Sequence, residues 1–521
     1  MQPMRPVRPS DSGAEAADVY ASAPLLNCLL REIGEPEPGP AGPGRRRVYR
    51  LPAGGRLLRV RDGRRPRDPE LFADGAWQPL GHAELVGLTA DELRLRTGLS
   101  NSELPAEMTD SRDAVAAILA ARKGVVPPAD PYRRSEQSLI TGHPHHPAPK
   151  ARGGGPVTGW LPYAPEAYAH FPLVLLGLRE DACVEDGDTR ALDALGEAPD
   201  GYRLLPAHPW QLDLVGTRPE IREAFADGRL VRLGPSTGTA WPTAAVRTLY
   251  VPGADLFVKF SLDVRITNDI RRLWRHDLLA LRRTDAAVTS AFRALVGGAA
   301  WLSDRGYRTA DFAFEELAVL VRDGLGEHVT PGSTPFLAAA LTEGTGGPHE
   351  PDGMAGFDGN PLDTLADPAA WWTAYLRQVV PPALELFARY GVVLEAHLQN
   401  TVVAEDGDGM PVQALFRDAE GVKLLPDVTR AAGWERLVYC LVVNNLLEIA
   451  EALRERHPWL DPWGPVRREL TRYAAELPET AELLRAPTLP GKTNLLLRWT
   501  GADGADARYL PVPNPLRVPD A

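Results

Sequence analysis

The chain has 521 residues, of which 44% are hydrophobic and 24% charged, and its formal net charge is −12. A chain of this length is too long for one compact core, so we expect about three domains or subdomains around a cleft. The acidic balance argues against a general nucleic-acid binder and favours small-molecule partners, although a local basic cleft remains compatible with it.

Cysteine usage and the absence of targeting signals indicate a cytoplasmic protein. Cys28, Cys183 and Cys440 are odd in number and far apart, so neither a disulfide framework nor a cysteine metal site is indicated. Residues 1–12 are polar and contain proline, and no run approaches the roughly 20 apolar residues of a membrane span. We therefore expect no membrane association.

The first third of the chain predicts structure without chemistry. Residues 14–33 have the apolar spacing of an amphipathic helix, and residues 48–58 begin a small sheet after a break rich in proline and glycine. Residues 80–121 favour helix, with an interruption near Pro105.

A loop rich in proline and glycine follows, over residues 136–156, and cannot form a regular helix. Its basic and imidazole side chains are those of His143, His145, His146, Lys150 and Arg152. The closely spaced histidines suggest zinc, but no cysteine is near and the only nearby acid is Glu136, so we expect no zinc. A rigid cationic loop that binds an anionic ligand is the favoured interpretation.

The middle of the chain predicts strands and helices. Residues 171–178 form a continuous apolar run typical of a buried strand, and a second strand ends at His208. His208 could be catalytic, but a buried histidine that fixes a turn is favoured. Residues 285–301 and 335–341 look helical, and residues 343–361 predict a loop between lobes.

Residues 243–273 predict the most informative element, a β-hairpin that turns at Pro252-Gly-Ala-Asp255. The second strand would run from Leu256 to Arg265 with one apolar and one charged face. Thr267-Asn-Asp269 would then cap a helix that carries Arg271. We expect Arg247, Lys259, Arg265 and Arg271 to converge as exposed cations that bind phosphates or carboxylates; a solvated, ion-paired sheet face is the alternative.

Residues 371–390 predict a helix, bent or interrupted at Pro381-Pro382, that leads into a strand or strand-turn over residues 391–403. This second segment would present Glu395, His397 and Gln399 on one side, with Asn400 at its exit. Asp418 ends the next apolar strand. These groups could hold a hard cation such as Mg²⁺, or form a hydrogen-bonded polar cluster.

The last part of the chain predicts an apolar core helix over residues 436–454 and a strand with two cations. Gly491-Lys-Thr493 imitates a P-loop, but the glycine required five positions earlier is Ala486, so we reject a Walker motif. Lys492 and Arg498 remain as cations on a C-terminal strand.

These motifs together resemble the IucA/IucC family of NRPS-independent siderophore synthetases, over roughly residues 15–500. The matching motifs are Gly142-His-Pro-x-His-Pro-x-x-Lys-x-Arg, His208-Pro-Trp-Gln, Arg247-Thr, Lys259-Phe-Ser-Leu-x-Val-Arg-Ile-Thr-Asn-x-Ile-Arg271, Glu395-Ala-His-x-Gln-Asn, Arg417-Asp418 and Lys492-x-Asn-x-x-x-Arg498. The resemblance implies an α+β, hand-like fold with a thumb (residues 1–150), fingers (151–345) and palm (346–521), with ATP between fingers and palm. We also expect a homodimer.

The resemblance further implies an ATP- and Mg²⁺-dependent enzyme. A carboxylic acid attacks the α-phosphate to give an acyl-adenylate and pyrophosphate, and an amine or alcohol then displaces AMP. Candidate catalytic residues are Lys259, Arg271 and His397; candidate nucleotide contacts are Arg247, Thr248, Lys259, Arg271, His397, Asn400 and Asp418. Candidate metal ligands are Glu395 and Asp418, and candidate contacts to substrate carboxylates are His146, Lys150, Arg152, Lys492 and Arg498.

The sequence departs from the family pattern at Ala245, where the family usually has serine two residues before the Arg-Thr pair. A hydroxyl contact to phosphate is lost there, which alters nucleotide affinity or marks a divergent acyl substrate. A non-catalytic or phosphotransferase-like ATP-binding relative is the alternative class. Citrate, a citryl derivative or a succinylated amine would each suit a pocket of Arg, Lys and His.

Overall fold

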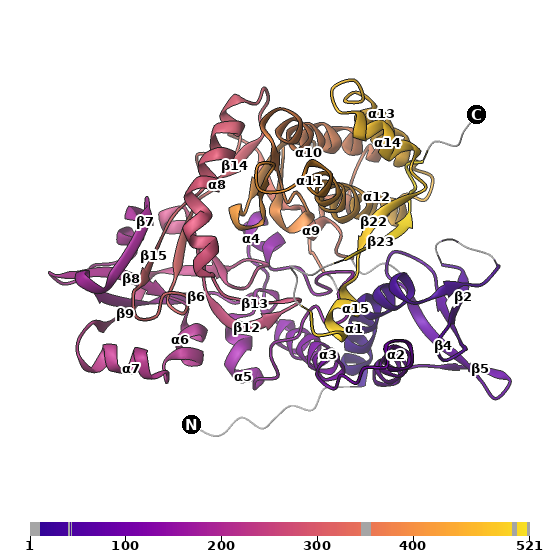
Figure 1. Ribbon diagram of the computed structural model, residues 1–521, viewed down its shortest axis with the longest axis horizontal. Coiled ribbons are helices and arrows are strands. Elements are labelled where there is room, and N and C mark those ends of the chain that lie inside the picture. The colour runs from indigo at the N-terminus through magenta and orange to yellow at the C-terminus, as the bar shows by residue number, and fades with distance from the viewer. Residues whose placement is uncertain (1–10, 40–41, 43, 345–355, 503–507, 518–521) are drawn as a thin grey trace.

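The structure, a computed structural model, describes residues 11–39, 42, 44–344, 356–502 and 508–517 of an α+β protein (Figure 1). In the described residues, every helix is too short or too polar to span a membrane. The predicted lobe boundary over residues 343–361 falls mostly outside the described residues.

The N-terminal lobe combines helices with a five-stranded antiparallel sheet in the order β1-β2-β3-β4-β5. Its elements are α1 (Asp11–Glu32), β1 (Glu35–Pro36), β2 (Arg46–Leu51), β3 (Arg56–Arg61), β4 (Arg67–Ala73), β5 (Ala76–Pro79), α2 (His82–Thr97) and α3 (Glu103–Arg122). The predicted break between two helices is confirmed, but it lies at Gly98 and not near Pro105. Gly98 ends α2 at a φ of 71°, whereas Pro105 lies inside the first turn of α3, where proline is tolerated.

The loop over residues 137–156 lies between α4 (Pro131–Glu136) and α5 (Val157–Trp160), and it contains no regular helix or strand, as predicted. An eight-stranded antiparallel sheet follows, in the order β7-β15-β16-β11-β10-β9-β6-β8. Its strands are β6 (Phe171–Arg179), β7 (Cys183–Gly187), β8 (Tyr202–Ala207), β9 (Leu230–Pro242), β10 (Thr248–Val251), β11 (Leu256–Phe260), β15 (Asp304–Ala310) and β16 (Val319–Asp323). Helices α6 (Pro209–Val215) and α7 (Pro219–Ala226) connect β8 to β9.

The predicted hairpin is confirmed as β10 and β11, which pair around a turn at Pro252–Ala254. The second strand is shorter than predicted. It stops at Phe260, and β12 (Leu262–Ile266) pairs instead with β13 (Asp269–Arg271). Both faces of β11 are buried. On the face predicted to be charged, Phe257 packs in a separate hydrophobic cluster with residues such as Tyr132 and Leu415.

The predicted helix start at Thr267 is wrong. Thr267 has a φ of 60° and forms a tight turn with Asn268, so the chain reverses into β13 and Arg271 lies on a strand. Helix α8 (Arg275–Ala294) begins only after Trp274 and ends before Trp301, which lies on β14 (Ala300–Leu302). The predicted helix at residues 335–341 is half strand, β17 (Thr334–Leu337), followed by α9 (Ala338–Leu341).

The C-terminal lobe is built mainly of helices around a four-stranded sheet in the order β14-β20-β19-β17. Its helices are α10 (Pro368–Tyr390), α11 (Arg430–Leu437), α12 (Leu447–Arg456), α13 (Trp463–Thr471) and α14 (Pro478–Arg485), with a π-helical stretch at Val438–Leu446. Its strands include β18 (Val392–Val393), β19 (Thr401–Glu405), β20 (Pro411–Arg417), β21 (Lys423–Leu424), β22 (Thr488–Lys492) and β23 (Tyr509–Pro513). Helix α10 runs unbroken through Pro381 and Pro382, and the predicted core helix at 436–454 is confirmed, interrupted only in its hydrogen-bond pattern.

Segments far apart in the sequence interleave in space. Strands β14 and β17 leave the middle of the chain to pair with β20 and β19 of the C-terminal lobe. Helix α15 (Asn494–Trp499) returns to the N-terminal lobe beside α1, where Leu495 and Trp499 join the core of that lobe (Figure 1). The centre of the molecule is therefore lined by segments from all parts of the sequence.

Candidate active site

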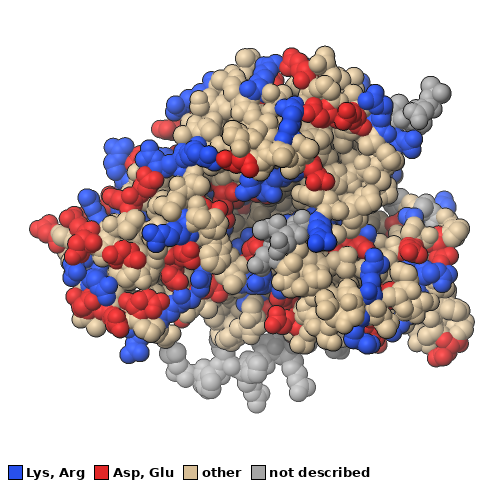
Figure 2. All heavy atoms as spheres, in the orientation of Figure 1, with Lys and Arg blue, Asp and Glu red and all other residues tan. Residues whose placement is uncertain are grey.

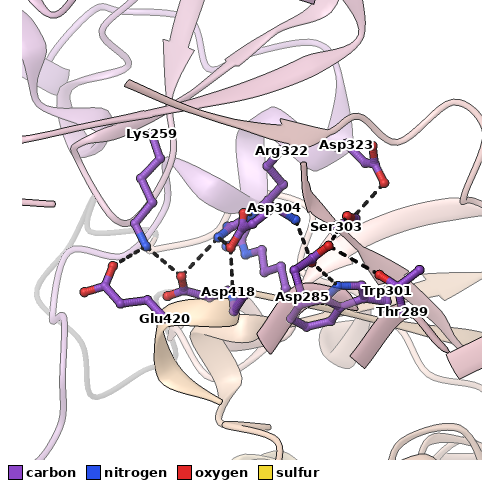
Figure 3. A network of polar contacts seen from close by, with 12 residues as sticks. Lys259, Asp285, Thr289, Trp301, Ser303, Asp304, Arg322, Asp323, Asp418 and Glu420 are labelled. Atoms are coloured by element: carbon purple, nitrogen blue, oxygen red, sulfur yellow. Dashed lines mark hydrogen bonds and ion pairs between the residues drawn. The ribbon is translucent and has the colours of Figure 1, made fainter. Parts of the chain in front are cut away.

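Lys259 lies at the junction between the eight-stranded sheet and the C-terminal lobe. Its side chain, on β11, is 3% exposed, and its Nζ donates to Asp418 Oδ1 at 2.6 Å and to Glu420 Oε2 at 2.7 Å (Figure 3). Asp418 follows the last residue of β20, as predicted, and adopts a φ of 84°. Thr248 is buried directly across from Lys259 in the β10–β11 pair.

A buried polar network fixes Asp418 from the side opposite Lys259. Arg322, on β16, donates to Asp418 Oδ1 at 3.0 Å and forms a two-bond pair with Asp304 at 2.6 and 3.1 Å (Figure 3). Asp304 also accepts a hydrogen bond from the Ala419 amide. Asp304 therefore fixes the backbone next to Asp418 as well as the Arg322 side chain that binds Asp418. Burial alone would raise the pKa of Asp418, but the Lys259 ammonium and the Arg322 guanidinium outweigh it and hold that pKa well below its usual range.

Arg247 joins Lys259 in binding Glu420. Arg247 is 6% exposed and follows Val246, whose φ is 65°. Its Nη2 contacts Glu420 Oε2 at 3.2 Å, and its Nη1 donates to the carbonyls of Arg271 and Arg272 at 3.2 and 2.9 Å. These contacts bring together Arg247, Lys259 and the strand that carries Arg271, as predicted. The prediction that these cations are exposed is wrong for Arg247 and Lys259, which are buried in ion pairs.

Arg271 is half-buried on β13 and donates to Thr267 Oγ1 at 2.6 Å. Burial, and then the nearby charge of Arg247, lower the pKa of Arg271, which shows how closely cations gather here. Arg265, the fourth predicted cation, donates to the Asn268 carbonyl in its own hairpin at 2.5 Å.

The segment after β18 carries a second group of predicted residues, but it is not a continuous strand. It reaches β19 through a single 3₁₀ turn at Leu398–Asn400. Glu395 Oε1 accepts from Arg436 at 2.8 Å, and its Oε2 lies 3.9 Å from His397 Nε2. Asn400 Nδ2 lies 3.5 Å from the same ring nitrogen. Burial lowers the pKa of His397, against the opposing charges of Glu395 and Asp418, which favours the neutral ring.

The donor set fits a divalent cation only in combination with ligands from a substrate. No cluster of three or more His, Cys, Asp or Glu side chains in the described chain is placed to hold a metal ion. Asp418 and Glu420, however, both contact the same ammonium, and each side chain is 26% exposed. Mg²⁺ typically binds one or two carboxylates together with phosphate oxygens and water, so this carboxylate pair suits it. Glu395, the other predicted ligand, is engaged by Arg436.

A third group of predicted residues lies where the loop over residues 137–156 meets α15, since Asn494 Nδ2 donates to the His145 carbonyl at 2.5 Å. His146 is 1% exposed, its Nδ1 accepts the Ala148 amide at 3.1 Å, and its Nε2 has no hydrogen-bond partner in the described residues. Burial, and next the charge of Arg498, lower the pKa of His146 to about 3. Lys492, at the end of β22, makes no ion pair within the described chain, and burial lowers its pKa.

Lys150 and Arg152, predicted to bind substrate carboxylates, are instead both paired with Glu166. Arg152 Nη2 lies 3.0 Å from Glu166 Oε1, which Lys150 also contacts, and the three side chains are 2–6% exposed. Burial would raise the pKa of Glu166, but the two cations lower it to about 2. Arg498 pairs with Glu107 and lies on α15, not on the predicted strand.

His208 fixes a turn, the favoured of its two predicted roles. Its Nδ1 accepts the Trp210 amide at 3.2 Å at the start of α6, and the side chain is fully buried. Glu136 also has a structural role, in which it connects segments that are far apart in the sequence. It pairs with Arg417 at 2.6 Å and accepts the Ala244 amide, which ties the start of the loop to β20.

Several residues of the site were missed from the sequence. They are Glu420, Arg322, Asp304 and Glu32. Glu32, on α1, accepts the amides of Asn494, Leu495 and Leu496, each at 2.8 Å, and so caps α15. Only Glu420 had a local signal, because it stands two residues after the predicted Asp418.

The fold is that of two solved proteins, an aerobactin synthetase and a petrobactin biosynthesis protein. The chain superimposes on the ATP-bound aerobactin synthetase IucA from a hypervirulent pathotype of Klebsiella pneumoniae with a TM-score of 0.78, 22% identity and coverage of 96% of this chain and 100% of that one. It matches the petrobactin biosynthesis protein AsbB from Bacillus anthracis with a TM-score of 0.77, 16% identity and coverage of 97% and 96%.

Sequence comparison finds similarity to two protein families and to several ligases. Residues 131–343 match the IucA/IucC family, and residues 369–507 match the ferric iron reductase FhuF-like transporter family. The L-2,3-diaminopropanoate–citrate ligase of Staphylococcus aureus is 28% identical over 74% of this chain and 75% of its own length. The N(2)-citryl-N(6)-acetyl-N(6)-hydroxylysine synthase of Escherichia coli is 30% identical over 57% of this chain and 56% of its own. The chain is thus similar to the IucA/IucC family over residues 131–343 and to citrate ligases over most of its length.

Proposed function

We propose that this protein is an ATP- and Mg²⁺-dependent siderophore synthetase that adenylates a carboxylic acid and condenses it with an amine or hydroxyl. The observation that carries the proposal is the convergence of Arg247 and Lys259 on the carboxylates that follow β20. Joining a carboxylate to ATP brings two anions together, which requires cations fixed in advance at the phosphates. Relatives named as citrate–amine ligases support this chemistry.

The residues around Lys259 form the nucleotide site in this proposal. Arg247, Thr248, Lys259 and Arg271 bind the phosphates, and His397 and Asn400 contact the nucleotide. Asp418 with Glu420 would hold Mg²⁺, which neutralises phosphate charge when bound. Lys259 and Arg271 stabilise the charge that develops on the α-phosphate and the leaving pyrophosphate.

His146, Lys492 and Arg498 are proposed to face the acid. Lys492 is the best placed, since it is a half-buried cation without an ion pair in the described chain. His146 presents a neutral Nε2–H as a hydrogen-bond donor, because its Nδ1 accepts a backbone amide. Lys150 and Arg152 are assigned a supporting role, in which Glu166 uses both of them to hold the loop.

The acid is proposed to be citrate, a citryl derivative or a succinylated amine, and the nucleophile an amine or alcohol. Citrate appears in the names of three relatives from two bacteria, each with a different amine partner. The enzyme is further proposed to act in the cytoplasm as a homodimer. Opposite charges are interspersed over the face seen in Figure 2, which suits small-molecule substrates better than a nucleic acid.

Product analysis tests the proposal. The protein is incubated with ATP, MgCl₂ and a panel of carboxylic acids and amines, and nucleotide products are separated. AMP and pyrophosphate that depend on both the acid and the amine are expected, and a Lys259→Ala variant should form neither. Formation of ADP would indicate a phosphotransferase instead, and ATP binding without turnover on every combination would indicate a non-catalytic relative.

A further inference from the structure

Glu420 contacts both buried cations of the nucleotide site. Its carboxylate accepts from Lys259 Nζ at 2.7 Å and lies 3.2 and 3.4 Å from Arg247 Nη2. We propose that Glu420 competes with phosphate for these cations and thereby makes nucleotide binding depend on a divalent cation. The inference rests on the function proposed above, and it assigns to Glu420 a positioning role exerted through Arg247 and Lys259.

Most N–H donors of Lys259 and Arg247 already have hydrogen-bond acceptors in the protein. An ammonium has three N–H donors, and Asp418 and Glu420 accept two of those of Lys259. Arg247 Nη1 donates hydrogen bonds to the carbonyls of Arg271 and Arg272, and its Nη2 donates to Glu420. A phosphate that uses the N–H groups now facing Glu420 must therefore share them with that carboxylate or replace it.

Glu420 is free to give way, whereas Asp418 is not. Asp418 is held by Arg322, which is itself fixed by the buried Asp304. In the described residues, the Glu420 side chain hydrogen-bonds only to Arg247 and Lys259, and it is 26% exposed. It projects from the short Ala419–Gly421 turn, whose Ala419 amide is anchored on Asp304. The backbone is therefore fixed while the carboxylate can rotate toward solvent.

A divalent cation removes the conflict between the two anions. Phosphate beside the Glu420 carboxylate is a like-charge contact in a partly buried site, where screening is weak. The Lys259 and Arg247 charges are already largely balanced by Asp418 and Glu420, as the lowered pKa values of both acids indicate after the opposing effect of burial. With Mg²⁺ the carboxylates become attractive partners of a metal–phosphate unit, so cation and nucleotide are expected to bind together.

Calorimetric titration of ATP tests this coupling without relying on turnover. Titrations are run in EDTA and in MgCl₂ on the wild type, on Glu420→Gln and on Glu435→Gln, a control that neutralises an exposed acid of α11. In EDTA, Glu420→Gln is expected to bind ATP about tenfold more tightly than the wild type, because the like-charge contact is gone. In MgCl₂ the advantage should vanish or reverse, and Glu435→Gln should follow the wild type throughout.

Equal affinities of wild type and Glu420→Gln in EDTA would overturn the proposal, as would wild-type affinity that is the same with and without Mg²⁺. Glu420→Ala is measured in parallel, with thermal midpoints as a check of folding, and should show the same relief in EDTA. Failure of the proposed function itself is distinct: it would appear as no binding of ATP to the folded wild type even in MgCl₂.

Discussion

Two lysine–carboxylate clusters in this protein have nearly the same composition and different surroundings. Lys150 and Arg152 meet Glu166, whose side chain is 3% exposed, whereas Lys259 and Arg247 meet Asp418 and Glu420, which are 26% exposed. Because Glu166 is buried, it cannot exchange Lys150 and Arg152 for a ligand, and the first cluster has a structural role. Access to the acids lets the second exchange partners with a ligand. The exposure of the carboxylate, more than that of the cation, separates a supporting ion pair from a candidate binding site.

The largest expected effect comes from removing the buried acid of the first cluster. Glu166→Ala leaves Lys150 and Arg152 uncompensated and is expected to lower the free energy of unfolding by about 3–5 kcal/mol. Urea denaturation measures this, with Glu197→Ala, at an exposed site, as a control that should change it by less than about 0.5 kcal/mol. A Glu166→Ala protein as stable as the control would contradict the structural role of the first cluster.

Arg271→Ala sharpens the comparison from the functional side. Loss of a preorganised cation at a developing charge is expected to cost about 3 kcal/mol, or about a hundredfold in the rate of adenylation. Arg271 is half-buried, so the fold should persist; Lys259, expected from the sequence to be exposed, is in fact 3% exposed and is a less clean site for this test. Pyrophosphate release quantifies the effect, and Arg293→Ala is the matched control. Near-normal release by soluble Arg271→Ala would exclude this role.

A third buried carboxylate, Glu405, extends the comparison to an acid without a cation. Its Oε1 accepts from Trp371 Nε1 at 2.8 Å, and burial raises its pKa to about 7. Because the folded-state pKa lies above the unfolded value, this group favours folding below about pH 4.5, and the contribution disappears as pH rises through about 7. The loss between pH 5 and 8 is expected to be about 2 kcal/mol.

Denaturation midpoints of wild type and Glu405→Gln at both pH values test this sign. The amide of the variant keeps an oxygen for Trp371 but cannot ionise, so the variant should lose less stability than the wild type on raising the pH. Parallel behaviour of the two proteins would show that Glu405 does not titrate in this range.

The smallest expected effect concerns Ala245, which is half-buried beside Arg247. If the missing hydroxyl only removes a neutral hydrogen bond to phosphate, Ala245→Ser should strengthen ATP binding by about 0.5–1.5 kcal/mol with the acid preference unchanged. The Michaelis constant for ATP and the ranking of acids are measured on both proteins. An unchanged ATP constant with a reordered ranking would mean that alanine makes room for a different acyl group.

Sequence reasoning succeeded where local patterns decide the structure. The β10–β11 hairpin follows from alternation around Pro252-Gly253, and the position of Asp418 follows from the apolar strand before it. Thr267-Asn268 misled because the same residues suit a helix cap and a tight turn, and the positive φ of Thr267 that decides between them has no local signal.

The partners of the charged residues could not be predicted, since they lie far apart in the chain. Arg322 meets Asp418 across 96 positions, and Lys150 and Arg152 gave no indication that Glu166 would neutralise them. Family resemblance and charge together therefore suggested five contacts to substrate carboxylates, of which Lys150 and Arg152 are instead paired with Glu166. Periodicity predicts where a side chain points, but burial of its counter-ion depends on the whole fold.

The cap that Glu32 provides for α15 has a consequence for how the enzyme is made. Glu32 and the amide of Asn494 are separated by 462 positions, so the helix that carries Arg498 gains its cap only after the long intervening stretch of chain has been synthesised. Domains fold during synthesis from the N-terminus onward, which lets the eight-stranded sheet form early. The residues of α15 proposed to face the acid can therefore reach their positions only after the eight-stranded sheet has been synthesised. Until then the Glu32 carboxylate of α1 lacks the backbone amides of α15.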